Sequence, residues 1–139
     1  MPRKRIIDPE FWLDNEISKL TYKNRLLYIG LWTLADDFGI LENDLNKIRA
    51  SVFPYSNCKI DKEMAELIRL KKLEEYEVEG KKYFWVKNFL KYQWFSHPSH
   101  KFPIIPVISS KIQQILKQKG GNRERDELNK KYPLVKIKT

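Results

Sequence analysis

The sequence has a single cysteine, no long apolar run and no secretion signal at its start. Cys58 alone cannot form an intramolecular disulfide, which fits a reducing compartment. A membrane helix needs about 20 consecutive apolar residues, and no run approaches that length. The first residues, MPRKRIIDPEFW, lack the apolar core and the small-residue cleavage site of a signal peptide. The sequence therefore predicts a cytoplasmic protein that does not contact a membrane.

Residue patterns typical of an enzyme, a cofactor site or a metal site are also missing. No serine or cysteine nucleophile stands beside a base, no glycine-rich phosphate loop occurs, and no paired carboxylates have a recognisable catalytic setting. The acidic residues within 36–44 lack the spacing of a calcium loop, and helix capping explains them better. His97 and His100 have a spacing that can hold zinc, but with no further ligand nearby they are better explained as surface histidines. We expect no catalytic residue, cofactor or metal.

The positive charge is unevenly distributed along the chain. The 139 residues, enough for one compact domain and an appendage, carry a net charge of +9, which favours a polyanionic partner. Residues 1–5 contain three basic side chains, and residues 81–139 contain fourteen basic and three acidic ones. Residues 6–80 contain ten basic and fifteen acidic side chains. Attraction to phosphates is therefore expected from the two ends of the chain rather than from its middle.

The run RLLYIGLWTLADDFG, residues 25–39, predicts a central core helix. Thr21 is a suitable N-cap, and apolar residues cover most of the helix circumference up to about Asp36. Gly30 in the middle of this helix costs about 1 kcal/mol against alanine, which indicates that another element packs closely there. Before this helix, Asp8 followed by Pro9 predicts a short capped turn.

Two short helices and a hairpin are expected after the central helix. Ile40–Glu42 suits a small strand, and Asn43 or Asp44 can cap the next helix. Asp61 is expected to cap a helix over 62–72. The buried stripe of that helix is predicted to be Met64, Leu67, Ile68 and the stem of Lys71. Residues 76–86 alternate and turn at Glu79-Gly80, which places Glu77 opposite Lys82.

This order of elements predicts a mainly α fold with a small β-hairpin, an α+β winged helix-turn-helix domain over residues 1–95. Three prolines within 96–106 favour an extended linker. Residues 107–139 are expected to form a basic amphipathic helix, Val107–Lys119, that Gly120-Gly121 ends, followed by a polar tail. The pattern leaves open whether this C-terminal extension packs on the core, pairs protomers or is disordered.

Basic side chains on the expected DNA-facing elements are the candidate functional residues. In a winged helix the second helix of the motif enters the major groove, and the wing lies along the neighbouring backbone. Glu63 and Glu66 on that helix favour the alternative that these cations are ordinary solvated residues. The candidate DNA-binding residues are Arg3, Lys4, Arg5, Lys62, Arg69, Lys72, Lys81, Lys82, Lys87, Lys91 and Lys101.

Several blocks of residues 5–95 together resemble one family. These blocks are Pro9-Glu10-Phe11-Trp12, Arg25-Leu26-Leu27, Gly30-Leu31-Trp32, Ala35-Asp36-Asp37-Phe38-Gly39, Phe53-Pro54, the wing over 76–83 and Asn88-Phe89-Leu90-Lys91-Tyr92-Gln93. In this order they are similar to the winged-helix N-terminal domains of phage and bacterial replication-initiation proteins of the DnaD-like, or replisome-organiser, type. The resemblance implies a domain that binds duplex DNA at an origin or self-associates, and that helps to recruit the replicative helicase or its loader.

The sequence leaves two other functions open. The amphipathic pattern at 107–119 and exposed aromatics such as Trp94 and Phe95 fit a protein-interaction scaffold that forms homo-oligomers or holds a replication partner. A winged helix also permits a transcriptional regulator.

Overall fold

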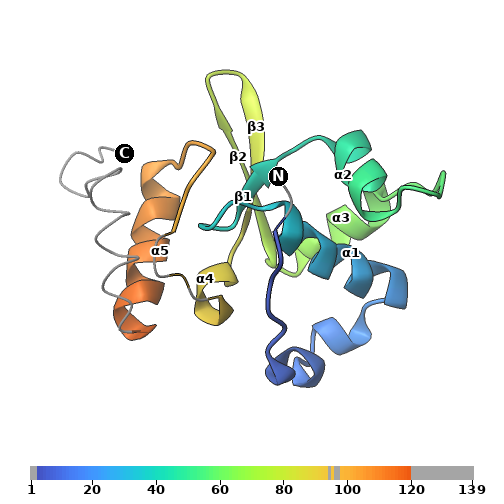
Figure 1. Cartoon of the computed structure of the whole chain (residues 1–139), viewed down its shortest axis with the longest axis horizontal. Helices are drawn as coiled ribbons and strands as arrows, with labels where there is room; N and C mark the ends of the chain where they lie inside the picture. The colour runs from blue at the N-terminus through green and yellow to red at the C-terminus, as the bar shows by residue number, and fades with distance from the viewer. Residues whose placement is uncertain (1–2, 94, 96–97, 120–139) are drawn as a thin grey trace.

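The computed structural model describes residues 3–93, 95 and 98–119, which form five α-helices and a three-stranded antiparallel sheet (Figure 1). Two short 3-10 helices, Pro9–Leu13 and Ile17–Lys19, precede them. The elements are, in chain order, α1 (Tyr22–Leu34), β1 (Ile40–Glu42), α2 (Leu45–Val52), α3 (Asp61–Arg69), β2 (Leu73–Val78), β3 (Lys81–Val86), α4 (Phe89–Tyr92) and α5 (Pro106–Lys119). In this part of the chain no helix combines the length and the apolar character that a membrane crossing requires.

Helix α1 begins as the sequence predicts and is buried on one side. The Thr21 hydroxyl oxygen accepts a hydrogen bond from the backbone N–H of Asn24, which confirms the predicted N-cap. Leu27 and Leu31 are fully buried, whereas Leu26 is 59% exposed. The prediction that apolar contacts surround most of the helix is therefore wrong on the side that carries Leu26.

Gly30 lies where α2 crosses α1. A Cβ atom at this position would come within 2.7 Å of Val52 Cγ1, so the expected close approach of another element is confirmed. The carboxylate of Asp44 accepts a hydrogen bond from the backbone N–H of Lys47 and caps α2. Ile48 on the same helix is buried in the core.

Helix α3 is shorter than the sequence predicts. It begins at Asp61 itself, with Ile60 as the N-cap residue, so the predicted side-chain cap by Asp61 is wrong. The helix ends at Arg69 because Lys71 adopts a left-handed conformation with φ 60°. The backbone N–H of Lys72 then donates to the carbonyl of Leu67, as in a Schellman motif. The turn leaves Lys71 exposed, so its stem is not part of the buried stripe.

The hairpin has the predicted turn and register. Strand order in the sheet is β1-β3-β2. Glu79 and Gly80 both have positive φ, 51° and 82°, which is the conformation of a type I′ turn. Glu77 lies directly opposite Lys82, as the sequence predicts.

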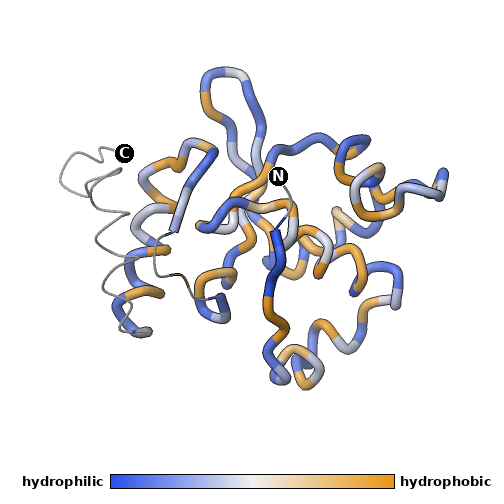
Figure 2. Tube along the Cα trace, in the orientation of Figure 1, coloured by the Kyte–Doolittle hydropathy of each residue, from blue (hydrophilic) through white to orange (hydrophobic). Residues whose placement is uncertain are grey.

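The sheet is covered on both faces. All four residues of β3 from Tyr83 to Val86 are buried, and a strand buried on both faces reads as a continuous apolar run. Helices α1–α3 lie on one side of the sheet and α4 and α5 on the other (Figure 1). Figure 2 shows apolar positions in the helices of both sides. The Lys111 amino group of α5 lies 5.9 Å from the Trp85 ring.

The described part of the predicted proline linker, residues 98–105, is tied to the core, and this corrects the expectation of a loose connection. The carboxylate of Asp36 accepts hydrogen bonds from the backbone N–H groups of Lys101 and Phe102, at 2.9 and 3.2 Å. The Tyr76 hydroxyl donates to the carbonyl of Pro103 at 2.6 Å. These hydrogen bonds hold the segment against the sheet, so that it covers one face of the sheet.

Helix α5 confirms the predicted amphipathic helix and packs on the domain. Its buried residues Ile108, Ile112 and Leu116 belong to the same hydrophobic core cluster as the residues of α1 and β3. The expectation that Gly120-Gly121 end this helix falls outside the described residues, as does the predicted tail over 122–139.

Candidate nucleic-acid interface

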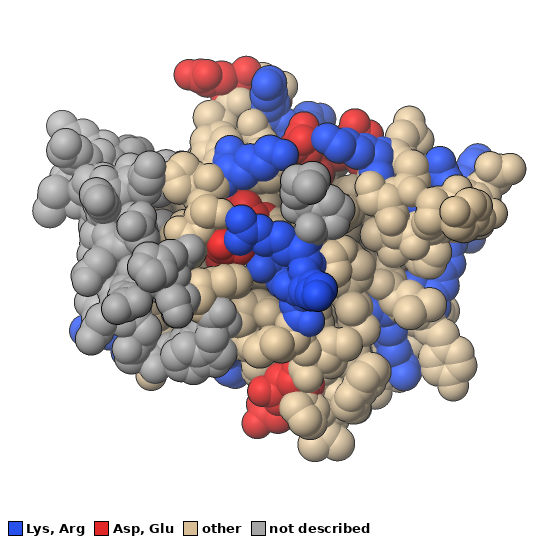
Figure 3. Space-filling model, in the orientation of Figure 1, with Lys and Arg blue, Asp and Glu red and all other residues tan. Residues whose placement is uncertain are grey.

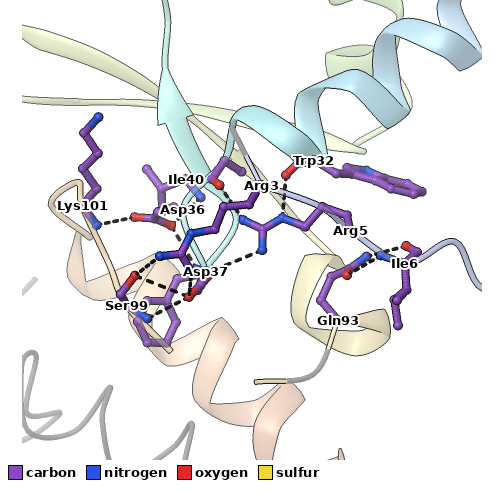
Figure 4. Close-up of polar contacts among 12 residues, drawn as sticks. Arg3, Arg5, Ile6, Trp32, Asp36, Asp37, Ile40, Gln93, Ser99 and Lys101 are labelled. Carbon is purple, nitrogen blue, oxygen red and sulfur yellow. Dashed lines mark hydrogen bonds and ion pairs between the residues drawn. The ribbon is translucent and has the colours of Figure 1, made fainter. Parts of the chain in front are cut away.

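Arg5, predicted to be part of a DNA-binding arm, is instead buried. Its side chain is only 3% exposed. The guanidinium donates to the carbonyl oxygens of Trp32 and Ala35, at 2.8 and 2.7 Å, and to Asp37 Oδ1 at 3.0 Å (Figure 4). It also lies 4.9 Å from the centre of the Phe89 ring. Arg5 therefore satisfies the carbonyls at the end of α1 and cannot reach a phosphate.

Arg3 is held by the same carboxylate but remains partly at the surface. Its Nη1 donates to Asp37 Oδ2 at 2.8 Å, and its side chain is 52% exposed. Asp37 is buried and also accepts a hydrogen bond from the backbone N–H of Ser99 at 2.9 Å. We call Arg3, Arg5, Asp37 and Ser99 the Asp37 cluster. It joins the N-terminal segment, the end of α1 and the segment before α5, while Lys4 stays exposed.

The neighbouring Asp36 closes the turn after α1. Its carboxylate accepts hydrogen bonds from the backbone N–H groups of Phe38 and Ile40 as well as from Lys101 and Phe102. Burial raises the pKa of Asp36, and the four N–H donors oppose that rise. The sequence-based explanation of the acidic residues as helix caps holds for Asp44, whereas Asp36 and Asp37 bind the turn and the segment before α5.

Helix α3 carries both basic and acidic side chains. Lys62 is exposed, but Arg69 pairs with Glu66 at 2.5 Å. The hydrogen bond from Arg69 lowers the pKa of the Glu66 carboxyl, and the same bond raises the pKa of Arg69. Asp61 and Glu63 add two further acidic side chains to the helix. The outer face of α3 is therefore not a strong attractor of phosphates.

Lys72, placed by the sequence at the edge of the interface, is held inside a cluster of carboxylates. Its side chain is 12% exposed, and its amino group lies 3.2 Å from Asp14 and 3.3 Å from Glu16. Burial acts to raise the pKa of Asp14, but the N–H of Ile17 and the Lys72 amino group outweigh it and lower the pKa. These ion pairs compete with any phosphate, so Lys72 is a poor DNA ligand.

The β2–β3 hairpin, predicted to be the wing, carries exposed side chains of both charges. Lys81 and Lys82 are exposed as predicted. Strand β2 and the turn carry the acidic Glu75, Glu77 and Glu79, which are also exposed, and Glu77 lies opposite Lys82. The hollow between this hairpin and the start of α3 is likewise mixed, since Asp44 and Asp61 line it together with Lys81 and Lys82.

The last three predicted residues lie on different elements. Lys87 follows β3 and is half-buried, and its backbone N–H donates to the carbonyl of Lys72. Lys91 is exposed on α4, with its amino group 5.4 Å from the Tyr92 ring. Lys101 is exposed and lines the same hollow as Arg3. Of the eleven predicted residues, Arg3 and Arg5 share the Asp37 cluster, and Arg3 and Lys101 line one hollow together with Asp36.

Sequence reasoning missed the residues that share a surface with Lys101. A second hollow, lined by Lys101 and Phe102, is also lined by Lys47 and Ser51 of α2 and by the acidic Glu42 and Asp44. No spacing in the sequence points to this set, because its members come from separate elements that only the tertiary fold brings together.

The predicted histidine pair is described only in part. His97 falls outside the described residues, and His100 is half-buried with its ring 6.3 Å from that of Phe38. Cys58 is half-buried in the loop between α2 and α3. Within the part of the chain that the structure covers, no three His, Cys, Asp or Glu residues gather as a metal site would require.

Comparisons of the chain with the models of known protein families, with curated proteins and with solved structures found no match.

Proposed function

We propose that this chain is a non-enzymatic DNA-binding module with a winged helix-turn-helix fold. The observation that carries the proposal is the order of elements together with the pairing of the strands. Three helices with a short strand between the first two are followed by a hairpin, and β3 pairs with both β1 and β2. Helix α1 contacts both α2 and α3, as the core of such a motif requires.

A role in phage-type replication initiation, with the replicative helicase or its loader as partner, is supported by the sequence resemblance over residues 5–95. A winged-helix transcriptional regulator is the alternative, and the same order of elements supports it. A defined operator sequence would favour the regulator, whereas binding to a helicase or loader would favour replication.

The binding of labelled oligonucleotides by the intact chain, followed by fluorescence anisotropy across a salt series, tests the DNA-binding proposal. We expect tighter binding at low salt and a log–log slope of about −0.9 for each phosphate neutralised on duplex DNA. The intact chain is required, because removal of residues 1–5 would also remove the buried Arg5. Absence of binding to both duplex and single-stranded oligonucleotides at low salt would contradict the proposal.

The second candidate function is self-association through the first 3-10 helix, and exposed apolar side chains favour it. Trp12 is 58% and Leu13 is 83% exposed, and adjacent exposed apolar side chains that form a contiguous patch are typical of interfaces, whereas single ones are not. Light scattering across a concentration series is expected to show a mass above that of the monomer for the native chain and the monomer mass for Leu13→Asp. Asn15→Asp, an exposed change two residues away, is the control. A monomer at every concentration of the native chain would exclude this function.

A further inference from the structure

The start of α1 and the loop between α2 and α3 lie at the same edge of the molecule (Figure 1). Lys23 Nζ donates to the backbone carbonyl of Lys59 at 2.6 Å, which holds the end of the loop against α1. At the beginning of the loop, Arg49 of α2 donates to the carbonyl oxygens of Phe53 and Ser56. We define the basic-aromatic edge as Tyr22, Lys23, Arg25, Arg49, Tyr55 and Lys59.

Two aromatic rings of the basic-aromatic edge are open to solvent. Tyr22 is 80% exposed and Tyr55 is fully exposed. A single exposed apolar side chain is common on a protein surface and by itself indicates no function. These two rings differ because cations lie beside them. The Arg25 guanidinium lies 5.3 Å from the centre of the Tyr22 ring, and Tyr55 precedes Ser56, whose carbonyl oxygen binds Arg49.

The two arginines of the edge are held in place without being neutralised. Arg25 donates to the carbonyl oxygens of Ile17 and Ser18, so its anchors are uncharged, as are those of Arg49. In the described part of the chain, neither guanidinium nor the Lys59 amino group lies within ion-pairing distance of a carboxylate. An anion can therefore bind these groups without first breaking an ion pair.

The acidic residues near the edge do not cancel its charge. Glu63 lies 3.4 Å from Lys23 Nζ and neutralises that cation alone. The two acidic residues within 14–16 pair with Lys72, and Asp61 lines the hollow that holds two lysines of the β2–β3 hairpin. Among the described side chains, the surface over the loop and the start of α1 shows basic groups and no acidic ones in Figure 3. The balance is positive, and its cations are Arg25, Arg49 and Lys59.

Exposed rings beside cations favour an unpaired nucleic-acid strand over a duplex. In a duplex the faces of the bases are stacked on one another, so a side chain cannot reach them. An unpaired base offers its face to an aromatic side chain, while neighbouring cations contact the phosphates. The two exposed tyrosines therefore find a stacking partner only in a single strand.

We propose that a single-stranded nucleic acid binds across the basic-aromatic edge. Its bases stack on Tyr22 and Tyr55, and its phosphates are contacted by Arg25, Arg49 and Lys59. This inference rests on the proposed DNA-binding function, and it names the form of the nucleic acid and the surface that binds it.

Fluorescence anisotropy with a labelled oligodeoxythymidylate, and with a duplex of the same length, tests the stacking. We expect the native chain to bind the single strand more tightly than the duplex. Tyr22→Ala/Tyr55→Ala is expected to weaken single-strand binding at least about tenfold, because one stacked base alone is worth a factor of about five. Tyr22→Phe/Tyr55→Phe keeps both rings and is the matched control, with an expected change below about twofold. Equal urea midpoints for the two variants check that both fold.

A salt series with the single strand tests the phosphate contacts. Lys59→Gln removes an exposed charge of the edge, and Lys62→Gln, an exposed change three residues later, is the control. Each phosphate neutralised on a single strand contributes about −0.7 to the log–log slope. We expect Lys59→Gln to reduce the magnitude of the slope by about 0.7 and Lys62→Gln to leave it unchanged. The arginines stay in place because each also binds two backbone carbonyls.

The outcomes separate this inference from the proposed function. An alanine variant that binds the single strand as tightly as the native chain overturns the edge assignment and leaves DNA binding intact. A duplex that binds more tightly than the single strand also overturns it. Equal losses for the alanine and phenylalanine variants exclude stacking, and equal slopes for Lys59→Gln and Lys62→Gln exclude the phosphate contact. No binding by the native chain to either oligonucleotide overturns both proposals.

Discussion

Replacing Arg5 with methionine is expected to lower the free energy of unfolding by about 3–5 kcal/mol, the cost of removing one partner from a buried ion pair. Methionine fills a similar space but leaves three acceptors without their donor. These are the carbonyl oxygens of Trp32 and Ala35 and the Oδ1 atom of Asp37. Asp37 is buried, so water cannot replace the lost guanidinium without opening the structure. Urea unfolding followed by tryptophan fluorescence measures the change.

Lys4→Met is the matched control for Arg5→Met. It makes a comparable chemical change one residue earlier, at an exposed position, and is expected to shift the free energy of unfolding by no more than about 0.5 kcal/mol. If Arg5→Met destabilised the protein as little as Lys4→Met, the Asp37 cluster would not be a structural element, and Arg5 would return to the set of candidate DNA ligands.

Arg5 also shows which part of the site could not be predicted from the sequence. Three basic residues at positions 3–5 are typical of a DNA-binding arm, and nothing local distinguishes them from one. The carboxylate that binds Arg3 and Arg5 belongs to Asp37, more than 30 residues away in the chain. Which cations are available for phosphates thus depends on tertiary contacts that the charge pattern does not contain.

Features that depend on neighbouring residues were predicted well. The N-cap hydroxyl of Thr21, the N-cap carboxylate of Asp44 and the turn at Glu79-Gly80 are each determined by a few consecutive residues. The predicted end of α3 is wrong, because Lys71 takes a positive φ although it is not glycine. The residue type of Lys71 does not indicate that conformation.

The sequence contains a signal for the second layer of the fold. Residues Tyr83 to Val86 form a continuous apolar run rather than an alternating one, which is typical of a strand covered on both faces. The element that covers the second face is the segment before α5 together with α5 itself. Its three prolines suggested a loose linker, but proline only restricts the backbone, and Asp36 and Tyr76 supply the hydrogen bonds that hold the segment on the sheet.

Gly39→Ala is expected to be the second strongly destabilising substitution, with a loss of about 2–5 kcal/mol in the free energy of unfolding from backbone strain and overpacking together. Gly39 has φ 87°, and a Cβ atom there would lie 2.7 Å from Cβ of Phe89 and 3.2 Å from the carbonyl oxygen of Val86. Its own carbonyl accepts a hydrogen bond from the N–H of Val86 at 2.8 Å, so the backbone cannot move away freely. The measurement is urea unfolding, as for Arg5.

Gly80→Ala separates the two causes of the Gly39 effect. Gly80 has nearly the same φ, 82°, but no atom lies within 4 Å of an added Cβ, so only the backbone strain of about 1–2 kcal/mol is expected. The excess loss in Gly39→Ala then measures the close approach between the turn after α1 and α4. Gly39 belongs to the turn that also carries Asp36 and Asp37, and its backbone N–H donates to the carbonyl of Asp36. Equal losses in the two variants would mean that the turn can relax and that the close contact with α4 contributes little to the loss.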